Sequence, residues 1–414
     1  GNVFFGDNLG VQIFDEEWAR QQPYDVLDAT KIIPEEDVPV QIVGRMVLDK
    51  YPDNFFAETE QVAFLPTNII PGIDFSNDPL LQGRLFSYLD TQKSRLGTTN
   101  FHQIPINAPK CPMHNFQRDG MMQTHQFTGR ATYEPNSLAN VNEPTGPRAS
   151  EQGFQTVAHQ EEVGTAKLRV RAETFADHFT QPRLFYQSQT VIEQTHIVEA
   201  FVFELSKVQL NHVRLRMLGQ LQNVDMELAR RVAEGLGLDL PPPIAAAKEP
   251  ITMPPSDALS ILKRAPVVAG RSLGMLVSNG AEAKLVYELQ DAASQAGVMI
   301  KIIAEKVGGV TLNDGQHLPA DEKVAGAPSV LFDGIALILT EPEAKRLAKQ
   351  SAVQDFVRDA FAHLKAIGYS SGAQPLLSLT QSRGDEFMIT LNSKAQGIAL
   401  INKLASRCWP RSSD

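Results

Sequence analysis

Arg84 and Tyr88 are the residues of this chain whose types and spacing most clearly permit chemistry, because they lie one helical turn apart. A phenol ordinarily loses its proton near pH ~10, and a guanidinium beside it favours the phenolate. A ferric ion bonded to the phenol oxygen favours the phenolate far more. The pair therefore predicts a tyrosine that can bind iron.

One helix must position this pair. Residues 80–97 read as a helix that ends at Gly97, and residues three and four apart share one face of a helix. That face carries Arg84, Tyr88, Thr91, Gln92 and Arg95. Arg95, near the helix end, could reach an acidic group such as a haem propionate, so the stripe suits a haem ligand. The alternative to a haem site is ordinary packing of the two side chains on the helix surface, which is the usual interpretation of an isolated Arg–Tyr pair.

The composition of the 414 residues narrows the class of protein. The length allows two or three domains, and 43% hydrophobic with 21% charged residues is ordinary globular composition. A net charge of −10 argues against nucleic-acid binding. Cys111 and Cys408 fit no zinc spacing and favour a reduced, cytoplasmic setting. No apolar run approaches ~20 residues and no signal pattern opens the chain, so we expect no membrane contact.

Periodicity divides the first half of the chain. Residues 38–48 are rich in β-branched side chains and predict a strand, as do residues 162–170. Residues 98–165 hold many Pro, Asn, Gly and Gln with little periodicity, which predicts a long ordered arm. Residues 208–238 predict two amphipathic helices.

Another helix precedes these two. Thr190 and Glu193 resemble a capping box that opens it, and His196 lies on its apolar stripe, where it reads as a core histidine. The prolines of residues 241–265 then predict a linker.

Beyond this linker, strands alternate with helices. We expect strands at 272–277, 298–304 and 334–339, and helices at 281–296, 344–367 and 394–406. This alternation predicts a doubly wound parallel sheet. The strand-to-helix turn at 339–343 contains no Cys, and Cys408 lies elsewhere, which argues against a cysteine-dependent hydrolase. The turn at 278–280 lacks a glycine-rich phosphate fingerprint, so we interpret this domain as a structural or interaction module.

Several blocks of sequence, taken in order, closely resemble haem catalases. They are residues 54–61 (NFFAETEQ), 64–72 (FLPTNIIPG), 81–88 (LQGRLFSY), 104–107 (IPIN) and 114–120 (HNFQRDG). The resemblance covers the chain after about residue 20 and is to the large-subunit type.

The resemblance implies an α+β catalase-type fold followed by an α/β flavodoxin-like domain. The implied parts are the second half of an antiparallel β-barrel with the proximal haem helix (1–97), a wrapping arm (98–165), a helical section (166–240), a linker (241–265) and a flavodoxin-like, amidotransferase-like domain (266–414). In the family the arm crosses between subunits of a homotetramer. The last domain occupies space that smaller catalases use for NADPH, so no NADPH is expected.

The resemblance also assigns roles around the haem. Tyr88 becomes the proximal iron ligand, as tyrosine is in catalases. Phe64 and Leu80 would line the haem, and Thr91 and Gln92 would sit at its edge; core packing is the alternative for these residues. Some large-subunit catalases have a His where this chain has Leu65, and that His can be joined to the tyrosine, so we predict no such crosslink.

The activity implied is dismutation of hydrogen peroxide to water and oxygen, as part of an oxidative stress response. In the family a distal His and Asn cleave the peroxide above the haem. The first histidine here is His102, already past Tyr88, so the resemblance implies that the chain is a carboxy-terminal portion without that distal segment. The alternative is a non-catalytic haem-binding or scaffold fragment that needs a complementary chain.

Overall fold

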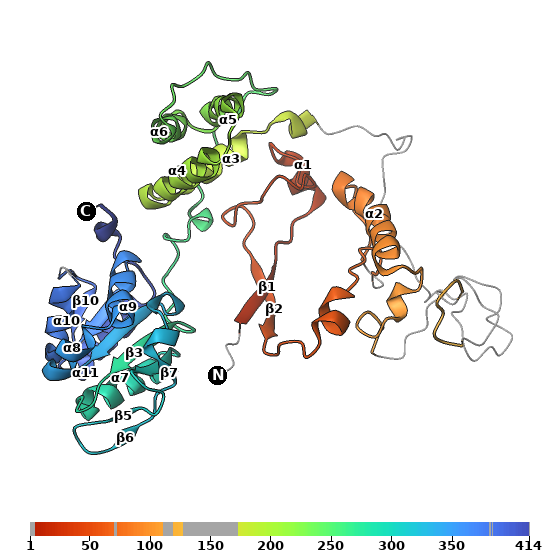
Figure 1. Ribbon diagram of the computed structural model, residues 1–414. Coiled ribbons are helices and arrows are strands. Elements are labelled where there is room, and N and C mark those ends of the chain that lie inside the picture. Colours follow the sequence, from red (N-terminus) through yellow and green to blue (C-terminus); the bar gives the residue numbers. More distant parts are fainter. Residues whose placement is uncertain are drawn as a thin grey trace, which may run out of the picture. The chain divides into compact units, whose positions relative to one another are not determined.

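The computed structural model describes residues 5–69, 73–110, 119–126, 173–380, 382 and 384–413 (Figure 1). The chain divides into two compact units, Gly1–Ser260 and Ile261–Asp414, and each is described by itself. The strand predicted at 162–170 and most of the predicted arm lie outside the described residues. Where the chain is described, it contains no helix long and apolar enough to cross a membrane.

The first unit begins with an antiparallel ribbon of β1 (Phe5–Val11) and β2 (Gln41–Leu48), with α1 (Glu16–Gln21) in the connection between them. The predicted strand at 38–48 is thus confirmed. Ile42 and Val43 are 60% and 59% exposed, and successive side chains of a strand point to opposite faces. The ribbon therefore presents apolar side chains on both faces. A two-stranded ribbon of this kind is only marginally stable by itself.

The helix predicted at 80–97 is present as α2 (Pro79–Leu96). The carboxylate of Asp78 accepts a hydrogen bond from the Leu80 N–H at 2.8 Å, and proline stands at the first turn, as is favoured there. Gly97 ends the helix with φ +73°, in the left-handed region that favours glycine. Both ends of α2 are therefore fixed by local sequence.

Four helices pack around a hydrophobic core in this unit. They are α3 (Thr180–Ser188), α4 (Val191–Ser206), α5 (Asn211–Val224) and α6 (Met226–Leu236). Leu218, Leu228 and Val232 are completely buried between them. The capping box of Thr190 and Glu193 at the start of α4 is confirmed. His196 lies on the exposed side of α4, so its prediction as a core histidine was wrong: the buried face of this helix passes through Val198 and Leu205.

The proline-bearing stretch that follows runs along these helices. The amide nitrogen of Gln222 donates to the Pro241 carbonyl at 2.9 Å, and that of Asn223 donates to the Ile244 carbonyl at 2.7 Å. Further on, Ser256 Oγ donates to a carboxylate oxygen of Glu36 at 2.6 Å. Side chains of the first unit therefore hold this stretch up to the boundary at Ser260.

The second unit is built on a six-stranded parallel sheet in the order β10-β9-β8-β3-β4-β7. The strands are β3 (Ser272–Val277), β4 (Met299–Ala304), β7 (Glu322–Lys323), β8 (Gly334–Ile338), β9 (Ala366–Tyr369) and β10 (Met388–Thr390). A small hairpin, β5 (Val310–Thr311) with β6 (His317–Leu318), lies outside the sheet. Counting the five main strands along the chain, the order is 2-1-3-4-5, with the topological switch between β3 and β8.

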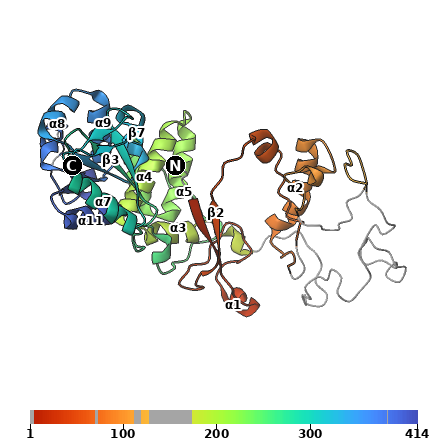
Figure 2. The ribbon, with the colours of Figure 1, turned by 90° about the horizontal axis from the view of Figure 1, so that it is seen from below.

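Helices cover both faces of this sheet (Figures 1 and 2). They are α7 (Ala283–Gln295) and α11 (Lys394–Lys403) on one face, and α8 (Glu341–Leu347), α9 (Ser351–Ala362) and α10 (Gln374–Leu379) on the other. Every residue of β8 is buried, as is typical of a central parallel strand. The predicted doubly wound sheet is thus present.

One expected element was wrong. Residues 344–367 were predicted as a single helix, but α8 ends at Leu347, α9 ends at Ala362, and β9 begins at Ala366. Leu364 has φ +60°, which no helix accommodates, so the chain turns sharply into the sheet. Periodicity alone cannot distinguish a short apolar run such as the start of β9 from the end of a helix.

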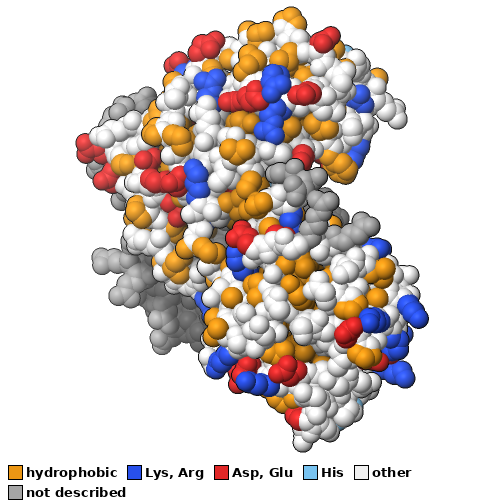
Figure 3. All heavy atoms as spheres, turned by 90° about the vertical axis from the view of Figure 1, so that its left-hand side faces the viewer, with side chains coloured by type: hydrophobic (Ala, Val, Ile, Leu, Met, Phe, Trp, Pro, Cys, Tyr) orange, Lys and Arg blue, Asp and Glu red, His pale blue; other side chains and the backbone are white. Residues whose placement is uncertain are grey.

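Acidic and basic side chains lie next to each other on the face seen in Figure 3. In the second unit, a network of charged side chains joins the end of β4 to α8. Arg346 donates to both carboxylate oxygens of Glu305, at 2.9 and 2.8 Å, and Gln350 donates to the same carboxylate at 2.6 Å. These hydrogen bonds lower the pKa of Glu305 to about 2.

We expect Arg346→Gln to lower the free energy of unfolding of the second unit by about 0.5–1 kcal/mol at pH 7, because both groups are partly exposed. The folded pKa of Glu305 lies below its unfolded value near ~4.3, so the contribution is present above that pH and is lost as the pH falls toward 2. Urea unfolding of both proteins at pH 7 and pH 3 measures this. A difference that stays constant across this range would contradict the assignment.

Candidate functional site

The predicted pair of Arg84 and Tyr88 is assembled on α2. Nη2 of Arg84 donates to the Tyr88 phenol oxygen at 3.3 Å, and the guanidinium carbon lies 4.8 Å from the ring centroid. Both side chains are half-buried. The arginine therefore contacts the oxygen and the ring together, which fixes the direction in which the phenol points.

Phe64 packs against the same tyrosine. The two ring centroids lie 5.7 Å apart with an interplanar angle of 76°, an edge-to-face arrangement. Phe64 is 61% exposed and Leu80, at the start of α2, is 55% exposed. Thr91 is also exposed. An aromatic ring left open to solvent beside a half-buried phenol provides apolar surface for a flat ligand.

Two side chains of the predicted stripe hold the Phe64 segment in place. Gln92 is only 5% exposed, and its amide donates to the Phe64 carbonyl at 3.1 Å. Arg95 donates to the carbonyls of Glu60 and Val62 at 2.6 and 2.5 Å, and also to the Gln92 side-chain oxygen. The structure thus gives Gln92 and Arg95 a positioning role: they hold residues 60–64 against α2.

Asn107 is a third member of this clamp, which sequence reasoning missed. Its side-chain oxygen accepts from the Ala63 N–H at 2.8 Å, while its nitrogen donates to the carbonyls of Gln61 and Phe101 at 2.9 and 3.0 Å. One amide therefore satisfies three backbone groups. The available signal was an asparagine in an irregular stretch, where such side chains often bond to backbone.

We expect Asn107→Ala to loosen the 60–64 segment and to cost about 2–4 kcal/mol locally, because three buried or half-buried backbone groups lose their partner at ~1 kcal/mol or more each. Hydrogen exchange at the Ala63 amide measures this directly. Asn54→Ala is a matched control, because Asn54 caps the neighbouring turn through its bonds to Phe56 and Ala57. Unchanged protection of Ala63 in Asn107→Ala would contradict the clamp.

A cavity of about 370 Å³ lies beside the start of α2. It is lined by Asp25, Leu27, Asp28, Ala29, Thr30, Asp78, Pro79, Leu80 and Phe175. The three carboxylates accept hydrogen bonds from nearby backbone N–H groups. Leu80 therefore lines this cavity at the start of α2, while Tyr88, further along the same helix, contacts Phe64.

The carboxyl end of the sheet in the second unit is closed by its own hydrogen bonds. Ser278 Oγ accepts from the Thr340 N–H at 3.1 Å, and Ser370 Oγ both accepts from the Leu339 N–H and donates to its carbonyl. Cys408 is 1% exposed, and burial raises the pKa of its thiol. The bond between Ser278 and Thr340 lies at the topological switch point between β3 and β8, where ligands bind in other doubly wound sheets. Cys408 lies at the other edge of the sheet, where its N–H donates to the carbonyl of Leu364, just before β9.

Comparison with known proteins places these features in one family. Three family models match: catalase over residues 6–140, catalase-related immune-responsive over 172–236, and the C-terminal domain found in long catalases over 269–406. Catalase C of Rhizobium meliloti is 46% identical over 411 residues, which is 98% of this chain and 57% of that protein. Catalase HPII of Pseudomonas putida is 42% identical over 407 residues, 97% of this chain and 57% of that protein.

The chain belongs to the catalase family. The third family model and the relatives named HPII and C identify it as similar to the long, large-subunit type, as the sequence blocks predicted. The chain spans about half the length of the curated relatives it matches, at 57% of the two named above.

Proposed function

We propose that this chain binds haem through Tyr88 and contributes the proximal side of a catalase that dismutates hydrogen peroxide to water and oxygen. The observation that carries the proposal is the Arg84–Tyr88 pair, hydrogen-bonded at 3.3 Å with the Phe64 ring against it, in a chain of the catalase family. A phenol oxygen is a hard donor suited to ferric iron, and tyrosine is the ligand that catalases use. The residues present therefore fit the group.

The chain's own residues would divide the work as follows. Tyr88 would hold the iron, and Arg84 would orient the phenol oxygen through its hydrogen bond. Phe64 and Leu80 would offer apolar surface to the porphyrin, and Thr91 would contact its edge. When bound, haem supplies the redox chemistry toward peroxide.

Positioning falls to the clamp described above. Gln92 and Arg95 bond to the backbone of residues 60–64, so they keep Phe64 against the Tyr88 ring. The Tyr88 ring is held by Phe64 and its phenol oxygen by Arg84. The side chain would therefore lose little conformational freedom on binding a metal, which favours affinity. We assign Arg95 this role in addition to the predicted contact with a haem propionate.

The finer features of the fold are part of the same proposal. The β1–β2 ribbon would belong to an antiparallel barrel, residues 98–165 would wrap a neighbouring subunit of a homotetramer, and the 2-1-3-4-5 sheet would be flavodoxin-like. Leu65 predicts no crosslink to Tyr88. We expect a cytoplasmic protein that binds neither NADPH nor nucleic acid.

A second candidate is a haem-binding or scaffold fragment that is active only with a complementary chain. The exposed apolar side chains on both faces of the β1–β2 ribbon favour it, because such a ribbon needs further strands to bury them.

Haemin titration followed by oxygen-electrode measurements separates the two candidates. If the chain alone is an active catalase, haemin produces a protein-bound Soret band, and the complex releases oxygen from hydrogen peroxide well above the rate of free haemin. If it needs a complement, the Soret band appears without added oxygen release. Absence of any protein-bound band would contradict both.

A further inference from the structure

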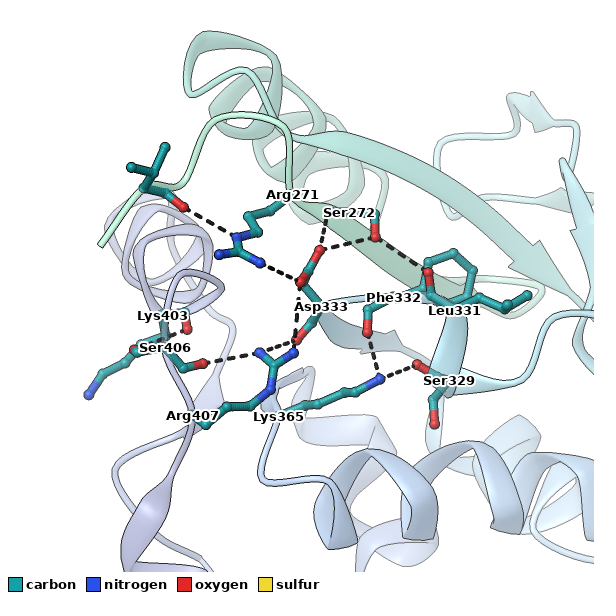
Figure 4. Close-up of polar contacts among 11 residues, drawn as sticks. Arg271, Ser272, Ser329, Leu331, Phe332, Asp333, Lys365, Lys403, Ser406 and Arg407 are labelled. Carbon is teal, nitrogen blue, oxygen red and sulfur yellow. Dashed lines mark hydrogen bonds and ion pairs between the residues drawn. The ribbon is translucent and has the colours of Figure 1, made fainter. Parts of the chain in front are cut away.

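Two arginines pair with one carboxylate, and a lysine lies nearby, at the amino ends of the central strands of the second unit (Figure 4). Arg271 precedes β3, Asp333 precedes β8 and Lys365 precedes β9, while Arg407 follows α11. These three strands are neighbours in the sheet, so residues distant in sequence meet at this edge. The charge of the cluster is formally three positive against one negative.

Asp333 is fully occupied by its neighbours. Its Oδ1 accepts from Nη1 of Arg271 at 3.1 Å and lies 3.8 Å from Nη2 of Arg407. Its Oδ2 accepts from the Ser272 N–H at 2.9 Å and from the Ser272 hydroxyl at 3.3 Å. Two guanidinium groups therefore share one oxygen atom of the Asp333 carboxylate, whose other oxygen already accepts two hydrogen bonds.

Lys365 adds buried positive charge that no carboxylate among the described residues contacts. It is 5% exposed, and its Nζ donates to the carbonyls of Ser329 and Phe332 at 2.8 and 2.7 Å. Burial, and then the charge of Arg407, lower the pKa of Lys365, while Asp333 and Asp359 partly oppose this. Burial also lowers the pKa of Arg407; Asp333 opposes this, and Arg271 adds a smaller repulsion. The cations of the cluster are thus incompletely compensated.

Donors remain available on the two arginines. Within the part of the chain that the structure describes, Nη2 of Arg271 and Nε of Arg407 donate to no acceptor. The Arg271 and Arg407 side chains are 40% and 28% exposed, so solutes can reach them. In Figure 4 both guanidinium groups lie beside Asp333, on neighbouring sides of its carboxylate.

From this geometry we propose that Arg271 and Arg407 form a binding site for a phosphate-class oxyanion, the group that paired guanidinium groups recognise. A dianion would balance the two surplus positive charges and would supply acceptors for the open donors. Val267 and Leu331, each 62% exposed, lie at the rim, since their carbonyls accept from Arg271 and from the Ser272 hydroxyl. The site lies on the opposite edge of the sheet from the closed switch point.

The test is protection from phenylglyoxal, which modifies accessible guanidinium groups, in the full chain with modification rates read residue by residue by mass spectrometry. Inorganic phosphate should slow modification of Arg271 and Arg407 by roughly tenfold at about ten times its Kd, as simple occupancy requires. Sodium chloride of equal ionic strength should not. Arg358, an exposed arginine on α9, is the internal control and should react equally in both salts.

Arg271→Gln provides the second arm. It leaves Arg407 present but removes half of the pair, so phosphate should protect Arg407 several-fold less in this variant. Repeating the measurement with glycerol phosphate distinguishes a phosphate ester from free phosphate as the preferred form. Equal protection by phosphate and chloride, or protection of Arg407 that survives Arg271→Gln unchanged, would overturn the proposal.

Discussion

Tyr88→Phe is expected to abolish iron ligation by this chain and to weaken haemin binding by at least about tenfold, since even partners of a metal's ligand contribute 10–100-fold in affinity. The substitution removes only the phenol oxygen, so the ring contact with Phe64 and the cation contact with Arg84 persist. The ends of α2 depend on Asp78 and Gly97 and are untouched. Haemin titration, followed through the Soret band, measures the change.

Tyr51→Phe is the matched control for this experiment. Tyr51 belongs to the same unit and is 79% exposed, so its loss should leave the haemin spectrum and affinity as they are. A Tyr88→Phe protein whose bound spectrum equals that of the parent chain would remove Tyr88 as the ligand. Circular dichroism of both variants shows whether the helices are retained.

The second large effect is expected from Gly372→Ala in the second unit. A methyl group on Gly372 would overlap the carbonyl oxygen of Leu339 and would lie 2.9 Å from the backbone nitrogen of Glu341. Backbone cannot move aside as a side chain end can. The loop after β9 would have to leave the turn after β8, which would break the paired hydrogen bonds between Ser370 and Leu339. We expect a loss of about 2–4 kcal/mol, at the upper end of overpacking costs.

Gly326→Ala is its control, because a methyl group there would meet no atom of the described residues within 4 Å. The chain has two tryptophans, Trp18 in the first unit and Trp409 in the second. Urea unfolding followed by Trp409 fluorescence in a Trp18→Phe background therefore reports on the second unit. Equal midpoints for the two glycine variants would show that the loop yields without cost.

The sequence predicted those features that local patterns determine. The α2 helix, its end at Gly97, the Arg84–Tyr88 contact and the capping box at Thr190 all depend on residues within a few positions of one another. Spacing on a helix is nearly fixed by its geometry, so such contacts follow from the sequence directly.

Features that depend on distant segments could not be predicted in this way. Gln92 and Arg95 face the expected side of α2, but their acceptors are carbonyls about thirty residues earlier, which no periodicity reveals. The start of the short strand β9 was included in the predicted helix 344–367, because the burial of this strand comes from neighbouring strands. His196 was misplaced because the packing of α4 against α6, and not its own hydropathy, selects the buried face.

The attachment of residues 241–256 to the helices has a practical consequence for dissecting the molecule. Proteases cut where backbone can leave its surroundings, and here the carbonyls of Pro241 and Ile244 and the side chain of Ser256 are all engaged. A fragment released by limited digestion would therefore carry the proline run with the helical core, and the sheet unit would begin only past Ser260.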